Sequence, residues 1–572
     1  MALSPVARAG IAVHIHGLGS DERDNVEAQL SLLTYAKGLK GKPPEAAEVQ
    51  PLLAQADADI RRALQPFGWY TPTIHNQVQH HGDNWVADYT VDAGPETDVI
   101  GIDIDLTGPG AKLPALVAAA RRRWPLKLGT RIKAQDYATV KDRLLGAAQA
   151  QGYLRARYTR HELKIDPAKR SAQVLLTLDT GPRFYFGPIT VEQSRARLKP
   201  AVIQRYLTIH EGQPFKPSEL LATQFALSDL GYFQDVELQP QRDAATPGHH
   251  IPVVVKLSYA KPFLYRFGVG YGTDTGARAL AGVQWRRVNS RGHTVSVDLQ
   301  PSQKISAAVA RYDIPFGSVP GQKYELTAQG LKQNFQGINE RLYSLGGARI
   351  HLQGVWKRRW YLSYVNDTYA IGGEPQRHST LLMPGVSFSR TDIDNPIYPR
   401  HGWALSVDVH GAPQAGALSS TNFLSTRVKL NAVFPIDWRW RVLLRGEEGA
   451  IFSTHFDRLP PSQRFFAGGN GSVRGYSYRS LAPRNQYGRV VGGKYLTTGS
   501  LELDWDIHRP YGVAAFVDAG GADDVPDVRL HVGAGLGFRY LAPFGTLALD
   551  VAHPFDRHSP AVRFDIAMRV GL

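Results

Sequence analysis

The chain has 572 residues, a net charge of +15, 43% hydrophobic residues and no cysteine. This length is enough for several domains, and the composition excludes a disordered or collagen-like chain. The lack of cysteine excludes thiolate metal sites, disulfide scaffolds and cysteine nucleophiles. No run of apolar residues is long enough to predict a transmembrane helix.

The first ten residues, MALSPVARAG, lack the apolar core of a signal peptide. A secreted precursor carries such a core near its N-terminus. Residue 11 already begins a stretch that resembles the first strand of a folded domain. We therefore expect that the signal peptide is not present in this chain.

One unit is repeated three times before residue 261. The steps Gly68-Trp69-Tyr70, Gly152-Tyr153-Leu154 and Gly231-Tyr232-Phe233 lie 84 and 79 residues apart. Each step follows the apolar spacing of an amphipathic helix and precedes the alternation that is typical of a strand. Further strands at 85–91, 172–178 and 251–257 end the units. A repeat of this period predicts an array of similar small domains, each with the order β-α-α-β-β.

This unit resembles the polypeptide-transport-associated (POTRA) domain, which is used in tandem in the periplasm. The resemblance implies three POTRA domains, at residues 11–94, 97–182 and 184–260. On the repeats alone, an array of unrelated small α+β modules is the alternative interpretation.

From residue 262 onward the apolar period becomes two. Leu501 and Leu503, for example, alternate with Glu502 and Asp504, so one face is apolar and the other is charged. A closed soluble core would have to bury these carboxylates, which is costly unless they are paired. About sixteen such segments fit the range, and bacterial barrels have even strand numbers. We therefore predict a closed, 16-stranded antiparallel transmembrane β-barrel at 262–572, with a wet lumen inside.

Most of the positive charge lies after residue 260. Basic chains often bind nucleic acid, but no basic helix and no basic run with interleaved aromatic residues is present. A barrel lumen and outer loops that face anionic lipid head groups explain the charge better. We therefore expect no nucleic-acid partner.

The longest segment without strand pattern, residues 453–490, carries the motif Val473-Arg474-Gly475-Tyr476. A loop of this length in a compact domain is usually functional. With the flanking stretch FFAGGNGSVRGYSY and the three repeats, the chain resembles the outer-membrane assembly-factor superfamily, which includes BamA and TamA, and the TamA type above all. In that superfamily the sixth extracellular loop folds into the lumen and carries a (V/I/L)-R-G-(F/Y) motif.

Two strands resemble further motifs of the superfamily. Residues 492–502 resemble its G-G-x₇-E strand, with eight residues in place of seven before Glu502, and residues 516–520 resemble its (F/Y)-x-D-x-G strand. The resemblance implies that Glu502 and Asp518 face the lumen and hold Arg474. The alternation agrees, because the apolar neighbours of both carboxylates would face lipid. Ordinary carboxylates on a wet lumen wall remain the alternative interpretation.

The first and last strands of the barrel are expected to meet at a lateral seam. Glycine and small residues weaken strand pairing, so fewer backbone hydrogen bonds are expected here than between other strands. The residues assigned to the seam are Phe267, Gly268, Gly270, Gly272, Phe564, Ile566, Met568 and Val570.

The resemblance implies a function in the bacterial outer membrane, with the POTRA domains in the periplasm. It implies that the protein promotes insertion or secretion of autotransporters and other barrel proteins. A TamB-like, inner-membrane-anchored periplasmic partner would dock on the POTRA end, and lipid transport between membranes, with outer-membrane lipids as partners, is a further role. The alternatives are a two-partner secretion transporter for one exported protein and a passive porin or receptor.

No catalytic pattern stands out. The sequence has no G-x-S-x-G elbow, no H-E-x-x-H and no P-loop. The glycine-rich runs at 268–272 and 533–537 do not open a helix, so we interpret them as bends in barrel strands. The histidine pairs lack acidic neighbours at metal-ligand spacing. We expect neither enzyme activity nor a cofactor or metal.

Overall fold

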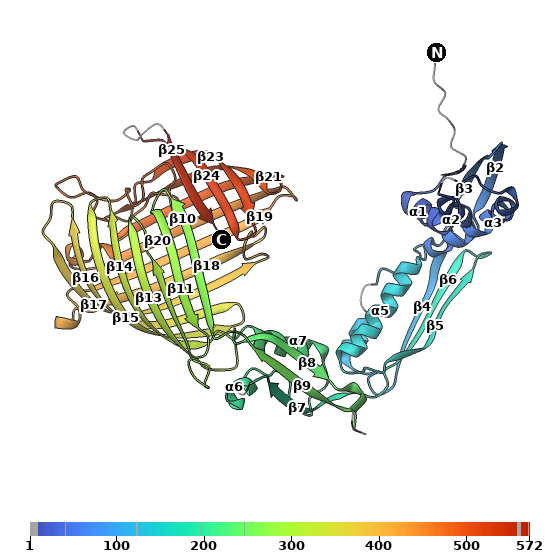
Figure 1. Cartoon of the computed structure of the whole chain (residues 1–572), viewed down its shortest axis with the longest axis horizontal. Coiled ribbons are helices and arrows are strands. Elements are labelled where there is room, and N and C mark those ends of the chain that lie inside the picture. The colour runs from blue at the N-terminus through green and yellow to red at the C-terminus, as the bar shows by residue number, and fades with distance from the viewer. Residues whose placement is uncertain are drawn as a thin grey trace, which may run out of the picture. The chain divides into compact units, whose positions relative to one another are not determined.

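The computed structural model describes residues 10–40, 42–121, 124–195, 197–244, 246, 248–556, 562–569 and 571. Three small α+β domains come first, and one large sheet of sixteen strands follows (Figure 1). The first two domains belong to one compact unit of the chain and the large sheet to another, while the third domain contributes to both. No helix among these residues is both long and apolar enough to cross a membrane.

The three small domains have similar elements in the same order. The first comprises β1 (Gly10–His16), α1 (Ser20–Gln29), α2 (Ser31–Gly38), α3 (Ala46–Leu64), the 3-10 turn η1 (Gln65–Phe67), β2 (Thr73–His81) and β3 (Asn84–Asp92). The second comprises β4 (Asp98–Thr107), α4 (Pro114–Arg121), α5 (Ala134–Ala150), β5 (Arg157–Asp166) and β6 (Ser171–Asp179). The third comprises β7 (Tyr185–Gln193), α6 (Pro200–Gln204), α7 (Pro217–Ser228), β8 (Phe233–Pro240), the 3-10 turn η2 (Arg242–Ala244) and β9 (His250–Tyr259).

Each small domain is built on a three-stranded sheet in which the last strand is central. The orders are β1-β3-β2, β4-β6-β5 and β7-β9-β8. The alternation predicted for the last strand buries every second side chain; in β3, Trp85, Ala87, Tyr89 and Val91 are buried. The helices of the first domain pack on this face and complete its core, because an amphipathic helix and a half-apolar strand both need a partner surface.

The first domain has three helices, where the sequence predicts two. Leu30 is fully buried with an extended backbone, and it separates α1 from α2. The backbone nitrogen of Ser31 then donates to the buried carboxylate of Asp59 on α3, at 3.0 Å. A carboxylate at a helix N-terminus satisfies a donor that has no partner within the helix, so this contact stabilises the start of a separate helix.

A glycine in the left-handed region follows the last helical segment before the second strand of each small domain. Its φ is +86° at Gly68, +93° at Gly152 and +69° at Gly231. The carbonyl of Gly68 accepts a hydrogen bond from the nitrogen of Thr97 at 3.3 Å, and that of Gly152 accepts one from Phe184 at 2.8 Å. Both donors lie where the next domain begins, so the repeated glycine-aromatic step forms the joint between consecutive domains.

Substitution at the second joint tests this role of the glycine. A Cβ on Gly152 would lie 2.8 Å from the carbonyl oxygen of Phe215, and alanine is strained at this φ. We expect Gly152→Ala to destabilise the small domains by about 1–3 kcal/mol, measured by urea unfolding of the detergent-solubilised chain followed by circular dichroism.

The matched control lies in the helix just before this joint. Gly146 is interior to α5, and a Cβ there meets no atom within 4 Å. Gly146→Ala is therefore expected to raise stability by about 0.5–1 kcal/mol, because alanine favours the helix. A Gly152→Ala variant with unchanged stability would contradict the joint.

The large sheet pairs each strand antiparallel with the next along the chain. This arrangement is the predicted 16-stranded barrel. Its strands are β10 (Phe263–Gly272), β11 (Gly276–Trp285), β12 (Thr294–Gln300), β13 (Ile305–Pro315), β14 (Lys323–Phe335), β15 (Ile338–Gln353), β16 (Trp356–Ile371), β17 (Arg377–Ile393), β18 (Gly402–Ala412), β19 (Phe423–Pro435), β20 (Trp440–Phe452), β21 (Tyr495–His508), β22 (Tyr511–Asp523), β23 (His531–Ala542), β24 (Gly545–Pro554) and β25 (Arg563–Arg569).

Side chains alternate between the two faces of the barrel as the sequence predicts. In β21, Leu501 is 45% exposed, whereas Glu502 and Asp504 are each 2% exposed. The apolar side chain faces outward, where it would meet lipid, and the carboxylates face the lumen. This orientation spares the carboxylates the cost of a lipid-facing position.

The barrel departs from the predicted closure at one place. β10 and β25, the two edges of the sheet, lie side by side. No backbone ladder joins them within the part of the chain that the structure describes. The barrel is therefore nearly closed, with one seam between its first and last strands.

Candidate functional site

The segment between β20 and β21, residues 453–494, folds back inside the barrel. It contains the 3-10 turns η4 (Phe456–Arg458) and η5 (Pro461–Gln463). Val473 and Arg474 are 0% exposed. Its apolar side chains share one buried cluster with wall residues, which are Leu342, Val365, Leu381, Met383, Ala412, Phe423, Ile451, Leu496 and Ala522.

Two buried carboxylates of the wall hold the start of this loop. The backbone nitrogen of Ser462 donates to Glu340 at 2.7 Å, and its hydroxyl donates to Asp367 at 2.7 Å. The amide of Gln333 donates to the other oxygen of Glu340. These wall residues lie on β14, β15 and β16. The loop is therefore anchored at one point to strands from the N-terminal half of the barrel.

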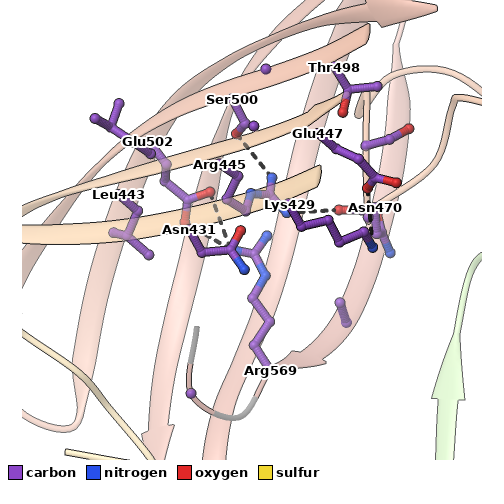
Figure 2. Close-up of a pocket in the computed structure, with 17 residues that line it drawn as sticks. Lys429, Asn431, Leu443, Arg445, Glu447, Asn470, Thr498, Ser500, Glu502 and Arg569 are labelled. Carbon is purple, nitrogen blue, oxygen red and sulfur yellow. Dashed lines mark hydrogen bonds and ion pairs between the residues drawn. The ribbon is translucent and has the colours of Figure 1, made fainter. Parts of the chain in front are cut away.

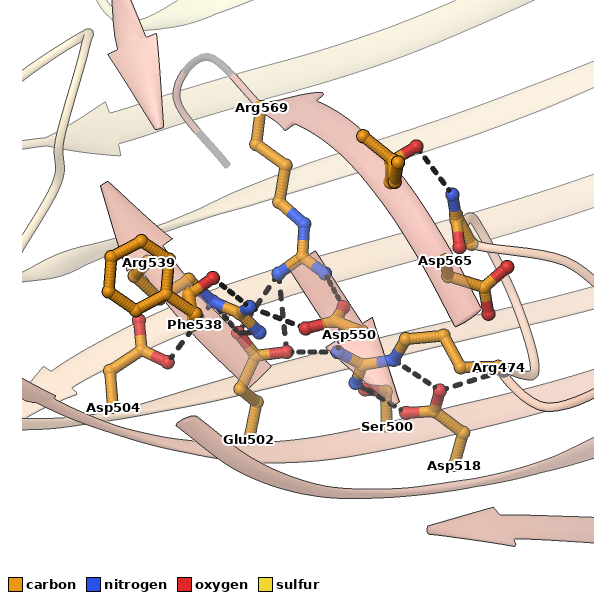
Figure 3. Close-up of polar contacts among 12 residues, drawn as sticks. Arg474, Ser500, Glu502, Asp504, Asp518, Phe538, Arg539, Asp550, Asp565 and Arg569 are labelled. Carbon is orange, nitrogen blue, oxygen red and sulfur yellow. Dashed lines mark hydrogen bonds and ion pairs between the residues drawn. The ribbon is translucent and has the colours of Figure 1, made fainter. Parts of the chain in front are cut away.

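Arg474 provides the second anchor, and it contacts both carboxylates named from the sequence (Figure 3). Its Nε and Nη2 donate to the two oxygens of Asp518 at 2.7 and 2.8 Å, and Nη1 donates to Glu502 at 2.5 Å. The backbone nitrogen of Arg474 also donates to Asp518, at 3.0 Å. Only a guanidinium can make this two-pronged bond to one carboxylate while it bonds a second.

The network around Arg474 balances three arginines against three carboxylates. Arg539 and Arg569 donate to Glu502 at 2.8 and 2.9 Å. Arg569 also donates to Asp550 at 3.0 Å, Arg474 donates to it at 3.2 Å, and Arg539 makes a further bond there. Each buried charge thus has opposite charges beside it, which offsets the large cost of removing an ion from water.

Two aromatic side chains contribute to the docking of the motif, Phe516 of the wall and Tyr476 of the motif itself. The guanidinium of Arg474 lies 3.4 Å from the centroid of the Phe516 ring, within the range of a cation–π interaction. The hydroxyl of Tyr476 donates to the carbonyl of Val532 at 3.1 Å.

Alternate glycines of β23 make room for the motif. A Cβ on Gly533 would lie 2.1 Å from the carbonyl oxygen of Arg474, and one on Gly537 would lie 2.0 Å from a carboxylate oxygen of Asp550. β23 pairs in regular register with both neighbours. The regular register shows no bulge in this glycine run, for which the sequence predicts a bend. Gly533 permits close approach of the loop, as does Gly475, whose φ is +92°, and Gly537 permits close approach of Asp550.

On β10, the residues assigned to the seam divide between the two faces. Phe267 is 80% exposed and the adjacent Val269 is 93% exposed, so the large side chains face outward. Gly268, Gly270 and Gly272 alternate with them, and the inner face of this strand therefore carries no side chain at three successive positions.

On β25, the assigned residues form a ladder on one side only. Phe564 is 70% exposed and faces outward. Ile566 and Met568 pair with residues of β24, and Val570 lies outside the described residues. The other side of β25 faces β10 without a ladder, so this edge retains backbone groups that no strand occupies.

Asn470, four residues before Arg474, spans the seam. Its side-chain nitrogen donates to the carbonyl of Ile566 on β25 at 3.2 Å and to the hydroxyl of Thr273 at 3.3 Å. Its backbone nitrogen donates to Asp274 at 2.8 Å. The hydroxyl of Thr273 in turn donates to Asp565 at 3.1 Å. Side-chain bonds therefore link the two edges, and the loop supplies part of them.

A cavity of about 380 Å³ lies beside the network, between the loop and the wall (Figure 2). Arg445 lines the cavity and donates at 3.0 Å to Ser500, its partner in the ladder between β20 and β21. Glu502 and Arg569 line the cavity as well. The network therefore has one side that water can reach. The other polar residues that line the cavity are Lys429, Asn431, Glu447, Asn470, Ser472 and Thr498.

Sequence reasoning missed four members of the site: Asp550, Arg539, Arg569 and Asn470. The first two had a usable signal, because each stands between outward apolar residues, as Glu502 does. The alternation that turns Glu502 inward also turns them inward. Asn470 had no such signal, since it lies in an irregular loop where no period applies.

Comparisons with known families agree with this architecture. The model of the Omp85 superfamily domain matches residues 255–568. The model of TamA POTRA domain 1 matches residues 12–93, and a POTRA model described as a surface antigen variable number repeat matches residues 184–258.

Individual relatives are distant. The chain is 23% identical to the outer membrane protein assembly factor BamA of Nitratidesulfovibrio vulgaris over 84% of its length, and 21% identical to BamA of Neisseria meningitidis over 64%. It spans only 62% and 51% of those two proteins. Among solved structures, BamA from Haemophilus ducreyi lacking POTRA domains 1–3 superposes with a TM-score of 0.66 at 15% identity, covering 82% of this chain and 99% of that one. The match over more than half of the chain shows that it belongs to the Omp85 superfamily of outer-membrane β-barrel proteins, which includes BamA and TamA.

Proposed function

We propose that this chain promotes the insertion or secretion of autotransporters and other barrel proteins by offering the edge of β25 to an incoming strand. The observation that carries the proposal is the seam. β10 and β25 lie side by side without a backbone ladder between them in the described residues. An edge strand presents a row of unpaired N–H and C=O groups, which is a template for another strand.

The composition of β10 makes the seam the place where the barrel opens most easily. Gly268, Gly270 and Gly272 offer no side chain for cross-strand packing, and glycine weakens a strand. Pairing of a client strand with β25 would replace weak contacts by a regular ladder. The energy for insertion then comes from the folding of the client itself.

The anchored loop supports this mechanism. Arg474 fixes the loop on β21, β22 and β24 through Glu502, Asp518 and Asp550. Asn470 reaches from that fixed point to the seam. The loop thereby stabilises the closed state while the edge strands keep no ladder of their own.

Placement and partners follow from the family resemblance. We propose that the three small domains lie in the periplasm, where they receive clients and dock a TamB-like, inner-membrane-anchored partner. Transport of lipid between the membranes is a second proposed role of the same pair. The match of the first domain to a TamA POTRA model supports this assignment.

A disulfide across the seam tests the proposal. The chain has no cysteine, so a pair introduced at Thr273 and Asp565, whose side chains lie 3.1 Å apart, has no competing thiol. In liposomes, the oxidised variant is expected to fold a urea-unfolded autotransporter β-domain no faster than empty liposomes do. Reduction should restore the rate, measured by heat-dependent mobility on gels.

The control disulfide joins two strands that are already paired. Ala548 and Ala567 face each other in the ladder between β24 and β25, so a cysteine pair there constrains the same last strand without bridging the seam. This variant should retain activity when oxidised. Full activity of the Thr273 and Asp565 lock would remove seam opening from the mechanism.

A further inference from the structure

Two cations face each other on the outer wall of the barrel. Lys332 on β14 and Arg341 on β15 are direct partners in the ladder, and both are exposed. They share the outward face with Leu326 and Tyr343, which are 54% and 65% exposed. Adjacent lumen-facing residues such as Glu340 are buried instead, so the outward direction of the two cations is set by strand alternation.

This cation pair has no carboxylate partner in the described part of the chain. No ion pair involves Lys332 or Arg341 there, and the next residues in the same row are Thr368 and His378, which bond each other at 2.8 Å. Like charges directly opposite one another destabilise a sheet. An anion bound from outside the chain would remove that repulsion.

An apolar groove of about 500 Å³ begins immediately beside the cations, on the side toward the middle of the barrel wall. The groove exists because successive outward positions of β13 and β14 carry alanine or glycine. The larger side chains of Tyr343 and Leu345 form its border. The lining residues are Val297, Ala308, Val309, Ala310, Ala328, Gln329, Gly330, Tyr343, Ser344, Leu345, Tyr364 and Asn366. A cationic end and an apolar trough together fit a molecule with an anionic head and a hydrocarbon chain.

The position of the pair along the barrel selects the leaflet. Lys332 and Arg341 flank the turn at 336–337, which lies at the same end of the barrel as the loop 453–494 and opposite to the end where β10 begins. With the small domains in the periplasm, as proposed above, this end faces the cell exterior. The lipid of that leaflet is lipid A, which carries phosphates.

We propose that Lys332 and Arg341 bind the phosphate of an outer-leaflet lipid, with one acyl chain in the groove below them. The guanidinium of Arg341 can fork onto a phosphate, and the ammonium of Lys332 adds a second charge. The site goes beyond client insertion; it gives the outer wall a fixed lipid next to β13–β16, and it rests on the proposed placement of the small domains.

Native mass spectrometry of the full chain in detergent, titrated with bisphosphorylated hexa-acyl lipid A, tests the site. The double variant Lys332→Gln, Arg341→Gln is expected to bind roughly 30-fold more weakly, because each basic side chain near a membrane surface contributes substantially to binding of anionic lipid. Dephosphorylated lipid A should bind the wild type and the variant equally weakly. Tight binding of inorganic pyrophosphate alone would show an anion site rather than a lipid site and would refute the role of the groove.

The matched control removes two outward cations of β15 and β16 at the opposite end of the barrel. Arg349→Gln with Arg358→Gln takes charge from the outer faces of β15 and β16 near the turn at 354–355 and should leave lipid A binding unchanged. If this control lost as much lipid A affinity as the Lys332, Arg341 double variant, the loss would depend on total charge alone, and the proposal would be overturned.

A second variant separates the groove from the charges and guards against misfolding of the double variant. A Cβ on Gly330 lies 3.5 Å from the ring of Tyr343, an ordinary contact, so Gly330→Leu should fold, fill the groove and weaken lipid A binding about tenfold while both cations remain. Unchanged binding in Gly330→Leu refutes the acyl site. Client folding in liposomes should be unaffected by either variant, so failure of lipid binding and failure of the proposed insertion function are distinguishable.

Discussion

Arg474→Ala is expected to release the loop from the lumen wall while the sixteen strands stay paired. The substitution leaves Asp518 fully buried, with Arg445 at 3.9 Å as its nearest remaining ion-pair partner. Removal of one partner from a buried ion pair costs about 3–5 kcal/mol. The loop itself pays entropy to remain ordered in the lumen, so this loss is large enough to shift it toward the released state.

Chymotrypsin provides the measurement. Phe465 and Tyr476 are each 6% exposed in the docked loop, so the wild type should resist cleavage after them and Arg474→Ala should be cut there. Heat-dependent gel mobility should show that the cleaved barrel is still folded. Seam-dependent client folding should fall with loop release.

Two comparisons sharpen this experiment. Arg474→Lys keeps the charge but cannot make both bonds to Asp518 and a third to Glu502, so its loop should be cleaved at a rate between those of the wild type and Arg474→Ala. Arg489→Ala removes an exposed arginine of the same loop that lies outside the network and should behave as the wild type. Resistance of Arg474→Ala to cleavage at both sites would show that the network does not hold the loop.

Gly533→Val is expected to expel the motif without changing any charge. A Cβ at this position would lie 2.1 Å from the carbonyl oxygen of Arg474. The strand cannot move away easily, because β23 is paired on both sides. Added atoms in a packed site cost about 1–3 kcal/mol even where the neighbours can adjust, and here the neighbour is loop backbone.

The same chymotrypsin cleavage after Phe465 and Tyr476 should appear in Gly533→Val, together with loss of client folding. Gly499→Val is the matched control, because a Cβ on this exposed glycine of β21 meets no atom within 4 Å. A Gly533→Val variant with a protected loop and full activity would mean that the close approach of Arg474 to β23 has no functional weight.

The sequence predicts the parts of this fold in which apolar and polar residues alternate regularly or a unit is repeated. Alternation places Leu501 outside and Glu502 inside, and the outcome holds because one face of a barrel strand must meet lipid. The motif and its two acidic strands likewise predict which residues Arg474 contacts. Each of these signals is local, within one strand or one repeat.

What the sequence does not reveal depends on contacts between distant segments. The break at Leu30 interrupts apolar spacing that reads as one helix, since the capping carboxylate of Asp59 lies 28 residues away from Ser31. The close approach of the loop to Gly533 on β23 has no signal in the sequence, because the loop and this strand are distant along the chain. Asn470 is one polar residue among many in the loop, and only the fold brings it to Ile566.

The short distance along the chain between Asn470 and Arg474 has a thermodynamic consequence. The two events are thermodynamically coupled, and coupling is reciprocal. If docking of Arg474 favours closure of the seam by a given factor in the equilibrium constant, opening of the seam weakens docking of Arg474 by the same factor. A strand that captures the carbonyl of Ile566 displaces Asn470 and so loosens the salt-bridge cluster without touching it. The loop therefore responds to pairing at the seam as well as restraining the seam. A spectroscopic label near Gly471 would register the pairing of a client strand with β25.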